Sequence, residues 1–600
     1  MGVVELPPSW DLSDLFTGLD DPRLKTVLPE ILKQAQAFEE RYRGKIQCSQ
    51  VTSELLLSAL RAYEEINRER TKPLAFAGLM FQADTTDPVR GALMQRLQEE
   101  STAISRHLIF FDLEIGRMDA GVFDRMAADP LLQGYRHYLL HEREISSHYL
   151  DEPEEKIVAE LRNTGSGAFC RLFSEVTSRM RFRVEREGGS EELTQSQVLS
   201  LLYDPNRSVR EAACRAVTET LRANTHVLTF IYNTLLQDKA TSDRLRKYEY
   251  AEQSRHQDNQ LSKEVVDNLV SVCAENFGVV ADYYRLKRKL LGLEKLTHAD
   301  RYAPLEEVKL EIPYSEARRT VLEAFERFSP RVREMTEEFF ENNWIDAALR
   351  PGKRGGAFCS SITPDLHPYV FMNYTGNARD VMTLAHELGH GLHGMLSRKQ
   401  HYLDFYPSLA MAETASVFAE MLVFEKLQSR LSSPRDRLIL LAGKIEDTFA
   451  TVFRQVAMYR FELAAHHARR TEGELTADRY SALWQENIQA MFRDSLELGE
   501  DHACWWSYIP HIYQSPFYVY AYAFGELMVL ALYARYQQEG PSFVDRYLSV
   551  LEAGGSQKPE DMLKAVGIDI RDRSFWQGGV DLIAALVAQA TALAEEANGV

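Results

Sequence analysis

Apolar residues recur every three or four positions along almost the whole chain, with charged residues between them. The pattern is clear over residues 28–44, 53–70 and 210–240, and it is typical of amphipathic helices that pack through one face. Strand-like runs are few, the best being residues 182–187 (FRVERE) and 368–374 (PYVFMNY). The sequence therefore predicts a mainly α-helical fold with a small β element.

The chain has 600 residues, which is too long for one small domain, since a domain commonly holds roughly 100–200 residues. Hydrophobic residues make up 45% of it, enough for a sizeable core. Boundaries are weakly marked, by an interruption at residues 187–190 (EGGS) and by a glycine-rich loop at 351–358. We expect residues 1–200 to form an N-terminal helical lobe and residues 201–600 to form a larger lobe that carries the chemistry.

The chain carries 69 Lys and Arg against 88 Asp and Glu, a formal net charge of −19. This charge repels phosphate backbones and anionic lipids, so we expect neither nucleic acid nor membrane as a partner. No uncharged apolar stretch reaches about 18 residues, and the best candidate, residues 517–536, contains Glu526. The six cysteines are scattered without a CxxC pair, and residues 1–16 show no secretory pattern. We expect a soluble, cytoplasmic protein with reduced thiols.

The clearest chemical motif is HExxH, formed by residues 386–390 (HELGH). On a helix, positions i and i+4 lie about 40° apart, so His386 and His390 point to one spot and suit one metal ion. Glu387 lies about 100° round the helix, where it reaches a metal-bound water without being a ligand. The competing interpretation is a chance match or an ordinary polar helix face.

Two features place this motif on a helix whose histidines face away from the core. Asn377 is a suitable N-cap, with Asp380 three residues later. The apolar stripe opposite both histidines consists of Val381, Leu384, Leu388, Leu392 and Met395. A helix that packs through this stripe presents both imidazoles to a cleft or to a second layer.

A catalytic zinc needs a third protein ligand that leaves the fourth position free for water. His393 lies on the same helix face but one turn further along, and the longer HExxHxxGxxH pattern fails because position 396 is Leu. The segment 407–427 is predicted to be a helix beginning at Pro407, and Glu413 lies among small residues within it that permit a close approach. The predicted metal ligands are His386, His390 and Glu413.

Two further features near the motif have open interpretations. Glu420, two turns after Glu413, is either bonded to a ligand histidine or a solvated surface residue. The strand 368–374 directly precedes the motif, so an extended peptide could pair with its edge and align the scissile carbonyl at the metal. An ordinary buried strand explains the same residues equally well.

A second group of candidate residues follows about 100 residues downstream, in the run HIYQSPFYVYAYAFGE. Ser-Pro at 515–516 predicts a helix start, with Ser as N-cap and Pro at the first position. Tyr518 and Tyr522 then share one face, Tyr520 lies nearly opposite unless the helix starts later, and His511 stands in the preceding loop. Neutral imidazole and phenol groups suit the stabilisation of an oxyanion. Aromatic-rich helices, however, more commonly belong to a core.

Together these stretches resemble the M3 family of zinc metallopeptidases, and within it most closely the oligoendopeptidase F group. HExxH alone occurs in many families, but its combination with AETAS and the HIYQSPFYVYAY segment is far more specific. The matching stretches span nearly the whole chain in the expected order: WDLSDLF (10–16), LRNTGSGAFCRLF (161–173), YYRLKRKLLGLEKLTHADRYAPL (283–305), GAFCSS and PYVFMNYTG (356–376), HELGHGLH (386–393), AETASVFAE (412–420) and HIYQSPFYVYAYAFGE (511–526). The end of the third stretch, HADRY, departs from related members.

The resemblance implies an almost all-helical, two-lobed fold like that of neurolysin and thimet oligopeptidase, with a deep central channel and a small β element beside the zinc helix. It implies one zinc ion per chain, bound by His386, His390 and Glu413. The expected function is zinc-dependent endopeptidase activity on internal bonds of short, unstructured oligopeptides, through a metal-activated water with Glu387 as general base. The groups expected to bind the substrate and the transition state are His511, Tyr518, Tyr522 and Tyr520.

Two other functions compete with this interpretation. A related helical peptidase that trims carboxy-terminal residues would need a fixed cation for the substrate carboxylate, and the sequence marks none. A non-enzymatic helical binding protein would account for an accidental motif, but the intact His/Glu/His/Glu set argues against it. A nucleotide-dependent enzyme is disfavoured because neither a P-loop nor GxGxxG follows a strand.

Overall fold

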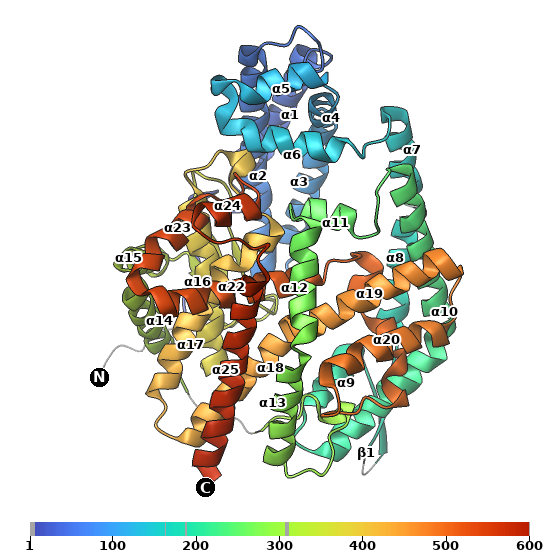
Figure 1. Ribbon diagram of the computed structural model, residues 1–600. Coiled ribbons are helices and arrows are strands. Elements are labelled where there is room, and N and C mark those ends of the chain that lie inside the picture. Colours follow the sequence, from blue (N-terminus) through green and yellow to red (C-terminus); the bar gives the residue numbers. More distant parts are fainter. Residues whose placement is uncertain (1–6, 163, 187–188, 306–310, 599–600) are drawn as a thin grey trace. The chain divides into compact units, whose positions relative to one another are not determined.

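The computed structural model describes residues 7–162, 164–186, 189–305 and 311–598 and is almost entirely helical (Figure 1). The chain forms two compact units, and each unit gathers three separate segments. The first unit comprises Met1–Ser147, Lys309–Ser429 and Arg535–Ile568, and the second comprises His148–Val308, Arg430–Ala534 and Asp569–Val600. This division differs from the expected one at residue 200, because helices distant in sequence bury their apolar faces against each other.

The first unit contains both the N-terminal helices and the HExxH motif. Its N-terminal helices are α1 (Arg23–Tyr42), α2 (Ser53–Ala83), α3 (Pro88–Arg106), α4 (Ile109–Gly116), α5 (Ala120–Ala128), η1 (Pro130–Tyr135) and α6 (Arg136–Ser146). The other elements are α14 (Tyr314–Phe328), α15 (Pro330–Glu341), β3 (Ile345–Asp346), β4 (Phe358–Ser360), β5 (Tyr369–Phe371), α16 (Ala378–Ser397), η4 (Tyr402–Asp404), η5 (Leu409–Thr414), α17 (Ser416–Arg430), η7 (Gly540–Phe543), α23 (Val544–Glu552) and α24 (Pro559–Ala565).

A three-stranded sheet lies beside the motif helix α16 in this unit. Its strand order is β3-β5-β4, with β3 parallel and β4 antiparallel to the buried central strand β5. Trp10 packs on the aromatic side chains of this sheet, with its ring centroid 5.5 Å from that of Phe371. Helix α16 contacts β4, β5, α14, α15 and α23, so the sheet and three helices fix it in place. The strand predicted at 368–374 is confirmed as β5, but β5 is paired on both sides, so the expectation that a peptide could pair with its edge is wrong. The outer strands of the sheet are β3 and β4.

The second unit is built around the long helix α10. Its elements up to residue 300 are α7 (Glu152–Arg162), α8 (Ser166–Arg179), β1 (Phe182–Arg186), β2 (Gly189–Leu193), α9 (Gln195–Ser200), η2 (Leu201–Tyr203), α10 (Arg207–Leu245), α11 (Gln253–Asp258), α12 (Lys263–Glu275), α13 (Phe277–Leu290) and η3 (His298–Asp300). The later elements are α18 (Pro434–Thr451), α19 (Phe453–Glu472), α20 (Ala477–Phe492), η6 (Glu500–Tyr508), α21 (Pro510–Gln514), α22 (Tyr520–Glu539) and α25 (Arg573–Asn598). Residues of α22 from Arg535 onward count with the first unit.

The strand predicted at 182–187 is confirmed as β1, which pairs with β2 in an antiparallel hairpin. The interruption at 187–190 therefore falls within a hairpin of the second unit rather than at a boundary between units, although residues 187 and 188 lie outside the described residues. A reversal of chain direction inside one unit uses the same glycines as a linker between units, so the sequence pattern alone does not separate the two cases.

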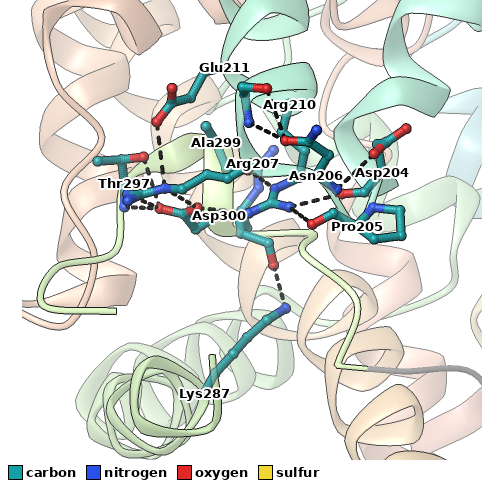
Figure 2. A network of polar contacts seen from close by, with 12 residues as sticks. Asp204, Pro205, Asn206, Arg207, Arg210, Glu211, Lys287, Thr297, Ala299 and Asp300 are labelled. Atoms are coloured by element: carbon teal, nitrogen blue, oxygen red, sulfur yellow. Dashed lines mark hydrogen bonds and ion pairs between the residues drawn. The ribbon is translucent and has the colours of Figure 1, made fainter. Parts of the chain in front are cut away.

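A polar network anchors the segment 298–302, whose role the sequence does not indicate (Figure 2). The fully buried carboxylate of Asp300 accepts hydrogen bonds from Arg207 Nη2 at 2.8 Å and from Arg210 Nη2 at 3.0 Å, both on the first turn of α10. Lys287 Nζ of α13 donates to the backbone carbonyl of Arg301 at 2.9 Å. Arg210 and Asp300 are buried, whereas 38% of the Arg207 side chain is exposed. Together with the bond from Lys287, these contacts tie α10 to α13 through this segment.

One helix among the described residues, α25, is long and apolar enough over 573–597 to cross a membrane by length and composition alone. It replaces the stretch 517–536 as the most membrane-like segment. Helix α25 packs against α12, α13 and α18. Of that apolar stretch, 39% is buried within the protein.

Candidate metal centre

The HExxH motif lies in the middle of helix α16. The helix begins as predicted, with Asn377 as N-cap and a capping box in which Asp380 returns the hydrogen bond. Four residues of the predicted stripe, Val381, Leu384, Leu388 and Leu392, are buried, and Met395 is half-buried. Both histidines remain partly accessible on the opposite side, with 27% of the His386 side chain and 24% of the His390 side chain exposed.

Glu413 meets the two histidines at one point. Its Oε2 atom lies 3.4 Å from His386 Nε2 and 3.5 Å from His390 Nε2. One donor atom from each of the three side chains lies within 4.8 Å of the others, and we call this set the metal centre. Two imidazoles and one carboxylate are the donor set of a catalytic zinc site that keeps an open position.

The segment that carries Glu413 differs from the predicted helix 407–427. Residues 409–414 form the 3₁₀ helix η5, and α17 begins only at Ser416. Ser416 Oγ donates to Glu413 Oε2 at 2.6 Å, which orients the carboxylate. Tyr547 of α23 donates to the carbonyl of Thr414 at 2.8 Å and holds the same segment from behind. The periodicity of apolar residues does not predict these side-chain contacts, so the sequence does not indicate the break between η5 and α17.

Gly389, inside the motif, allows this segment to approach α16. A Cβ atom at Gly389 would lie 2.5 Å from the carbonyl oxygen of Ala415 and 2.6 Å from Cα of Ser416, too close for any side chain. The small residues around Glu413 predict a close approach from that segment, but the small residue that makes the approach possible is Gly389 on α16. A glycine in a helix interior destabilises the helix by about 1 kcal/mol relative to alanine, so Gly389 within the motif indicates a close contact at this position.

The electrostatics of the centre favour a cation. Burial lowers the pKa of His386, but a hydrogen bond to Glu420 and the charges of Glu413 and Glu420 outweigh it and raise the pKa to about 9. Glu420 Oε2 lies 3.4 Å from His386 Nδ1, on the side of the ring away from Glu413. Burial lowers the pKa of His390 to about 4 despite the charge of Glu413. A carboxylate behind a ligand imidazole fixes the ring's orientation and raises its basicity.

Glu387 lies next to the centre without joining it. Only 5% of the residue is exposed, and its Oε2 atom has no hydrogen-bond partner among the residues that the structure describes. Burial, opposed by His386 and reinforced by Glu413, raises the pKa of this carboxyl to about 7. A buried carboxyl oxygen without a partner costs free energy. The Glu387 carboxyl lies where a proton acceptor beside a metal site is expected. The residues present therefore fit a bound divalent cation.

A cavity of about 540 Å³ opens onto the metal centre, entirely within the first unit. Its walls are residues 357–361 of the edge strand β4 and its flanks, the histidine face of α16, and residues 405–407. His393 also lines the cavity but lies outside the group of metal-binding atoms. An extended ligand in this cavity would run along the edge of a sheet.

The second predicted group lies in the second unit. His511 is on the short helix α21 rather than in a loop, and its Nε2 atom is 3.4 Å from the hydroxyl of Tyr522. The ring of Tyr518 stacks on His511 with centroids 6.2 Å apart, and it meets the ring of Tyr522 at 5.1 Å. We call these three half-buried side chains the tyrosine cluster. Burial lowers the pKa of His511, so its imidazole is neutral at pH 7.

Tyr520 is separate from this cluster. Its side chain is fully buried, and its hydroxyl accepts a hydrogen bond from Asn259 Nδ2 at 2.8 Å. The predicted helix start at 515–516 is wrong, because α22 begins at Tyr520 and Tyr518 lies in the preceding turn. Phe517 has φ 58°, which a continuous helix does not permit, and its N–H donates to the buried Glu462 at 2.8 Å. Burial of Phe517 thus overrides the local Ser-Pro signal.

Comparison with known protein families decides the identity. The model of peptidase family M3 matches residues 200–582, and that of oligopeptidase F matches residues 114–182. The chain belongs to peptidase family M3. As a member of this family it is a metallopeptidase, as the motif predicts.

Individual relatives agree with this M3 membership along the length of the chain. The chain is 28% identical to oligopeptidase PepF of Bacillus subtilis, over 94% of this chain and 84% of the relative. It is 26% identical to an oligoendopeptidase F homolog of Borreliella burgdorferi, over 96% of both. Among solved structures, a candidate peptidase from Chlamydophila abortus superposes with a TM-score of 0.87 at 25% identity, covering 98% of this chain and 100% of that one. Oligoendopeptidase-F from Enterococcus faecium has the same fold, with a TM-score of 0.70 at 22% identity and coverage of 95% and 98%.

Sequence reasoning missed the M3 peptidase residues that support the two groups. Tyr547 and Glu462 belong to helices far from either motif, and each makes its contact through a single hydrogen bond to the backbone. Glu462 lies on α19 among buried residues that include Phe461, Ala465 and His466. Acidic residues are rarely buried without a specific partner, so no local pattern in the sequence indicates the burial of Glu462.

Proposed function

We propose that this M3 peptidase is a zinc-dependent endopeptidase that hydrolyses internal bonds of short oligopeptides. The observation that carries the proposal is the convergence of His386, His390 and Glu413 on one point beside the buried, unpartnered carboxyl oxygen of Glu387. A surface cluster of histidines and carboxylates would not leave a buried acceptor next to it.

His386, His390 and Glu413 would hold one zinc ion per chain, with Glu420 orienting the ring of His386. A bound zinc ion supplies Lewis acidity that polarises the scissile carbonyl and acidifies water. The side-chain contacts of Ser416 and Tyr547 keep the Glu413 segment in place. The protein's contribution is therefore a rigid donor set that does not need to reorganise.

Glu387 acts as the general base. Its carboxylate accepts the proton of the attacking water and later delivers it to the nitrogen of the leaving amine, so that the amine departs neutral. Its burial excludes bulk water, and its lack of another partner leaves an oxygen free to take the proton. The charge of His386 favours the ionised form of Glu387, and the charge of Glu413 favours its protonated form.

From the resemblance to the M3 family, we propose that His511, Tyr518 and Tyr522 bind the substrate and stabilise the transition state. A neutral imidazole and two phenols are donors that carry no charge into the ground state, so they favour the transition state selectively. Tyr520, buried and bonded to Asn259, has no part in this role.

The peptide lies in extended form along β4. The edge of this strand and the metal centre face one cavity, and an added strand would use the free backbone groups of the sheet edge. Backbone recognition of this kind accepts many sequences, which suits a peptidase of short unstructured chains.

All six cysteines are free thiols, as expected for the cytoplasm.

A matched pair of variants tests the proposal. Glu387→Gln is expected to keep one zinc per chain and to lower cleavage of a quenched peptide by about 10²–10⁴-fold, since the base is lost. Glu413→Gln is expected to lose zinc, because an amide is a much poorer ligand than a carboxylate. Metal analysis and initial rates, with chelator treatment and zinc add-back of the unchanged protein, provide the measurements.

Products of end-blocked peptides of about 5 to 30 residues separate the rival activity. Internal cleavage of a peptide blocked at both ends supports an endopeptidase, whereas trimming that requires a free carboxyl end supports the rival. Near-normal turnover by Glu387→Gln would remove Glu387 from the mechanism. A purified protein without bound metal, inactive after zinc addition, would overturn the proposed function.

A further inference from the structure

The turn before α22 has a conformation that its residues do not favour. Phe517 has φ 58°, in the left-handed region that bulky residues rarely adopt. Its ring is fully buried and lies 4.5 Å from the ring of His466 and 6.0 Å from that of Tyr459, both on α19. Such backbone strain persists only where the surroundings enforce it, and it is common beside functional groups. Tyr518 directly follows this residue.

Glu462 of α19 is the group that enforces the turn. Its Oε1 atom accepts the N–H of Phe517 at 2.8 Å, and its side chain is fully buried. Its Oε2 atom has no hydrogen-bond partner within the described part of the chain. Burial raises the pKa of this carboxyl to about 8, against the smaller effect of that same hydrogen bond. The positive charges of Arg255 and Lys239 lower the pKa of this carboxyl to a smaller extent. A buried carboxyl with one hydrogen bond is costly, so that bond and these charges distinguish Glu462 from an apolar residue.

Arg255 of α11 holds the same turn from the other side. Its Nε atom donates to the carbonyl of Pro516 at 3.4 Å, and its guanidinium carbon lies 5.6 Å from the ring centroid of Tyr518. An ion pair with Asp258 at 3.3 Å fixes the arginine. The peptide group between Pro516 and Phe517 is thus held by side chains from two helices of the second unit, its N–H by Glu462 and its carbonyl by Arg255.

We propose that Glu462 is a positioning residue: by holding the left-handed turn at Phe517, it aims Tyr518 and Tyr522 at His511. The inference rests on the proposed function, in which these three side chains stabilise the oxyanion. Without the acceptor, the N–H of Phe517 would be buried and unpaired, and the turn would relax toward the helical conformation that Ser-Pro favours. The tyrosine rings would then leave their places beside the imidazole.

The test replaces Glu462 by residues of similar size. Glu462→Met removes the acceptor and leaves little cavity, whereas Glu462→Gln keeps an oxygen that accepts the same N–H. Asn233→Leu is a stricter control, because Asn233 is also buried in the second unit and makes more hydrogen bonds. Its Oδ1 atom accepts from the N–H of Leu475 at 3.0 Å and from the hydroxyl of Tyr480 at 2.9 Å, and its Nδ2 atom donates to the carbonyl of Leu475 at 2.8 Å. If Glu462→Met does not fold, Glu462→Asp, which shortens the reach by one methylene, takes its place.

Kinetics distinguish positioning from a purely structural role. Glu462→Met is expected to lower kcat by about 10- to 100-fold with KM changed less than about threefold, since displaced donors act on the transition state. Glu462→Gln and Asn233→Leu are expected to keep kcat within about twofold. In a Tyr518→Phe, Tyr522→Phe background, Glu462→Met should cause little further loss, because its effect passes through those hydroxyls. A wild-type kcat in Glu462→Met, or an equal loss in both backgrounds, overturns the proposal.

A measurement without substrate separates this inference from the proposed function. With 3-fluorotyrosine at position 518, ¹⁹F NMR of the full-length protein is expected to give one resonance that moves or splits in Glu462→Met and returns in Glu462→Gln. An unchanged resonance in Glu462→Met overturns the positioning role. If the unchanged protein cleaves no peptide, the proposed function fails, while this spectrum still decides whether Glu462 places Tyr518.

Discussion

The metal centre and the tyrosine cluster are held in place in opposite ways. In the metal centre, two of the proposed ligands are fixed by the spacing of one capped helix, and the third follows within 25 residues. In the tyrosine cluster, Tyr518 depends on a bond between Phe517 and Glu462, 55 residues apart, that overrides a local helix signal. The difference teaches that side chains on a regular helix can be predicted from periodicity, whereas side chains on a turn require the partner that holds the turn.

The largest effect that probes this contrast concerns the donors. Tyr518→Phe, Tyr522→Phe and His511→Ala are each expected to lower kcat by about 10²–10³-fold, the cost of losing one oxyanion donor. Tyr520→Phe is the matched control and should stay within about threefold, since its hydroxyl bonds only Asn259 in the described residues. Initial rates under saturating peptide, with zinc content checked, measure each change. A larger loss in Tyr520→Phe than in Tyr518→Phe would reverse our assignment of the cluster.

A smaller effect is expected from the support of the metal centre. Gly389→Ala places a Cβ against the backbone at 415–416, so the Glu413 segment must shift, at a cost of about 1–3 kcal/mol. We expect weaker zinc binding by about 10- to 100-fold, as for other disturbed ligand supports. Gly443→Ala, on α18 with nothing within 4 Å of the new Cβ, is the control. Competition with a chelator measures the affinity; equal affinities in the two variants would mean that the close approach at Gly389 is dispensable.

The smallest expected effect concerns the support of the tyrosine cluster, and it is a change of stability with pH. The pKa of Glu462 is raised to about 8 in the folded protein from an ordinary 4.5, so the folded state keeps a proton that the unfolded state loses. The stability this provides is complete below about pH 4.5 and is lost as pH rises through about 8, amounting to a few kcal/mol at most. Glu462→Gln cannot ionise and lacks the dependence. Calorimetry should therefore show that the unfolding temperature of Glu462→Gln, relative to that of the unchanged protein, rises by a few degrees between pH 5 and pH 8.

A constant difference in midpoint between these two proteins across that pH range would show that Glu462 is ionised in the folded state.

Several particulars were predictable from the chain alone. The helix cap at Asn377, the buried stripe of α16 and the strand around Tyr369 follow from local patterns of two to four residues. Glu413 was found because small residues marked a close approach, although the contact itself is made by Gly389. The division of the chain into units was not predictable, because each unit combines three segments whose apolar faces carry no label of their partner.

The sequence by itself determined a mainly helical chain and predicted two imidazoles and a carboxylate as the ligands of one metal ion, because helical period and side-chain type depend on neighbours along the chain. Only the tertiary structure decided where α22 begins, which tyrosines face His511, and which contacts Glu462 and Gly389 make beside the two groups. The physical reason is that these features arise from burial and from single contacts between distant segments, which cost or gain free energy only once the chain has folded.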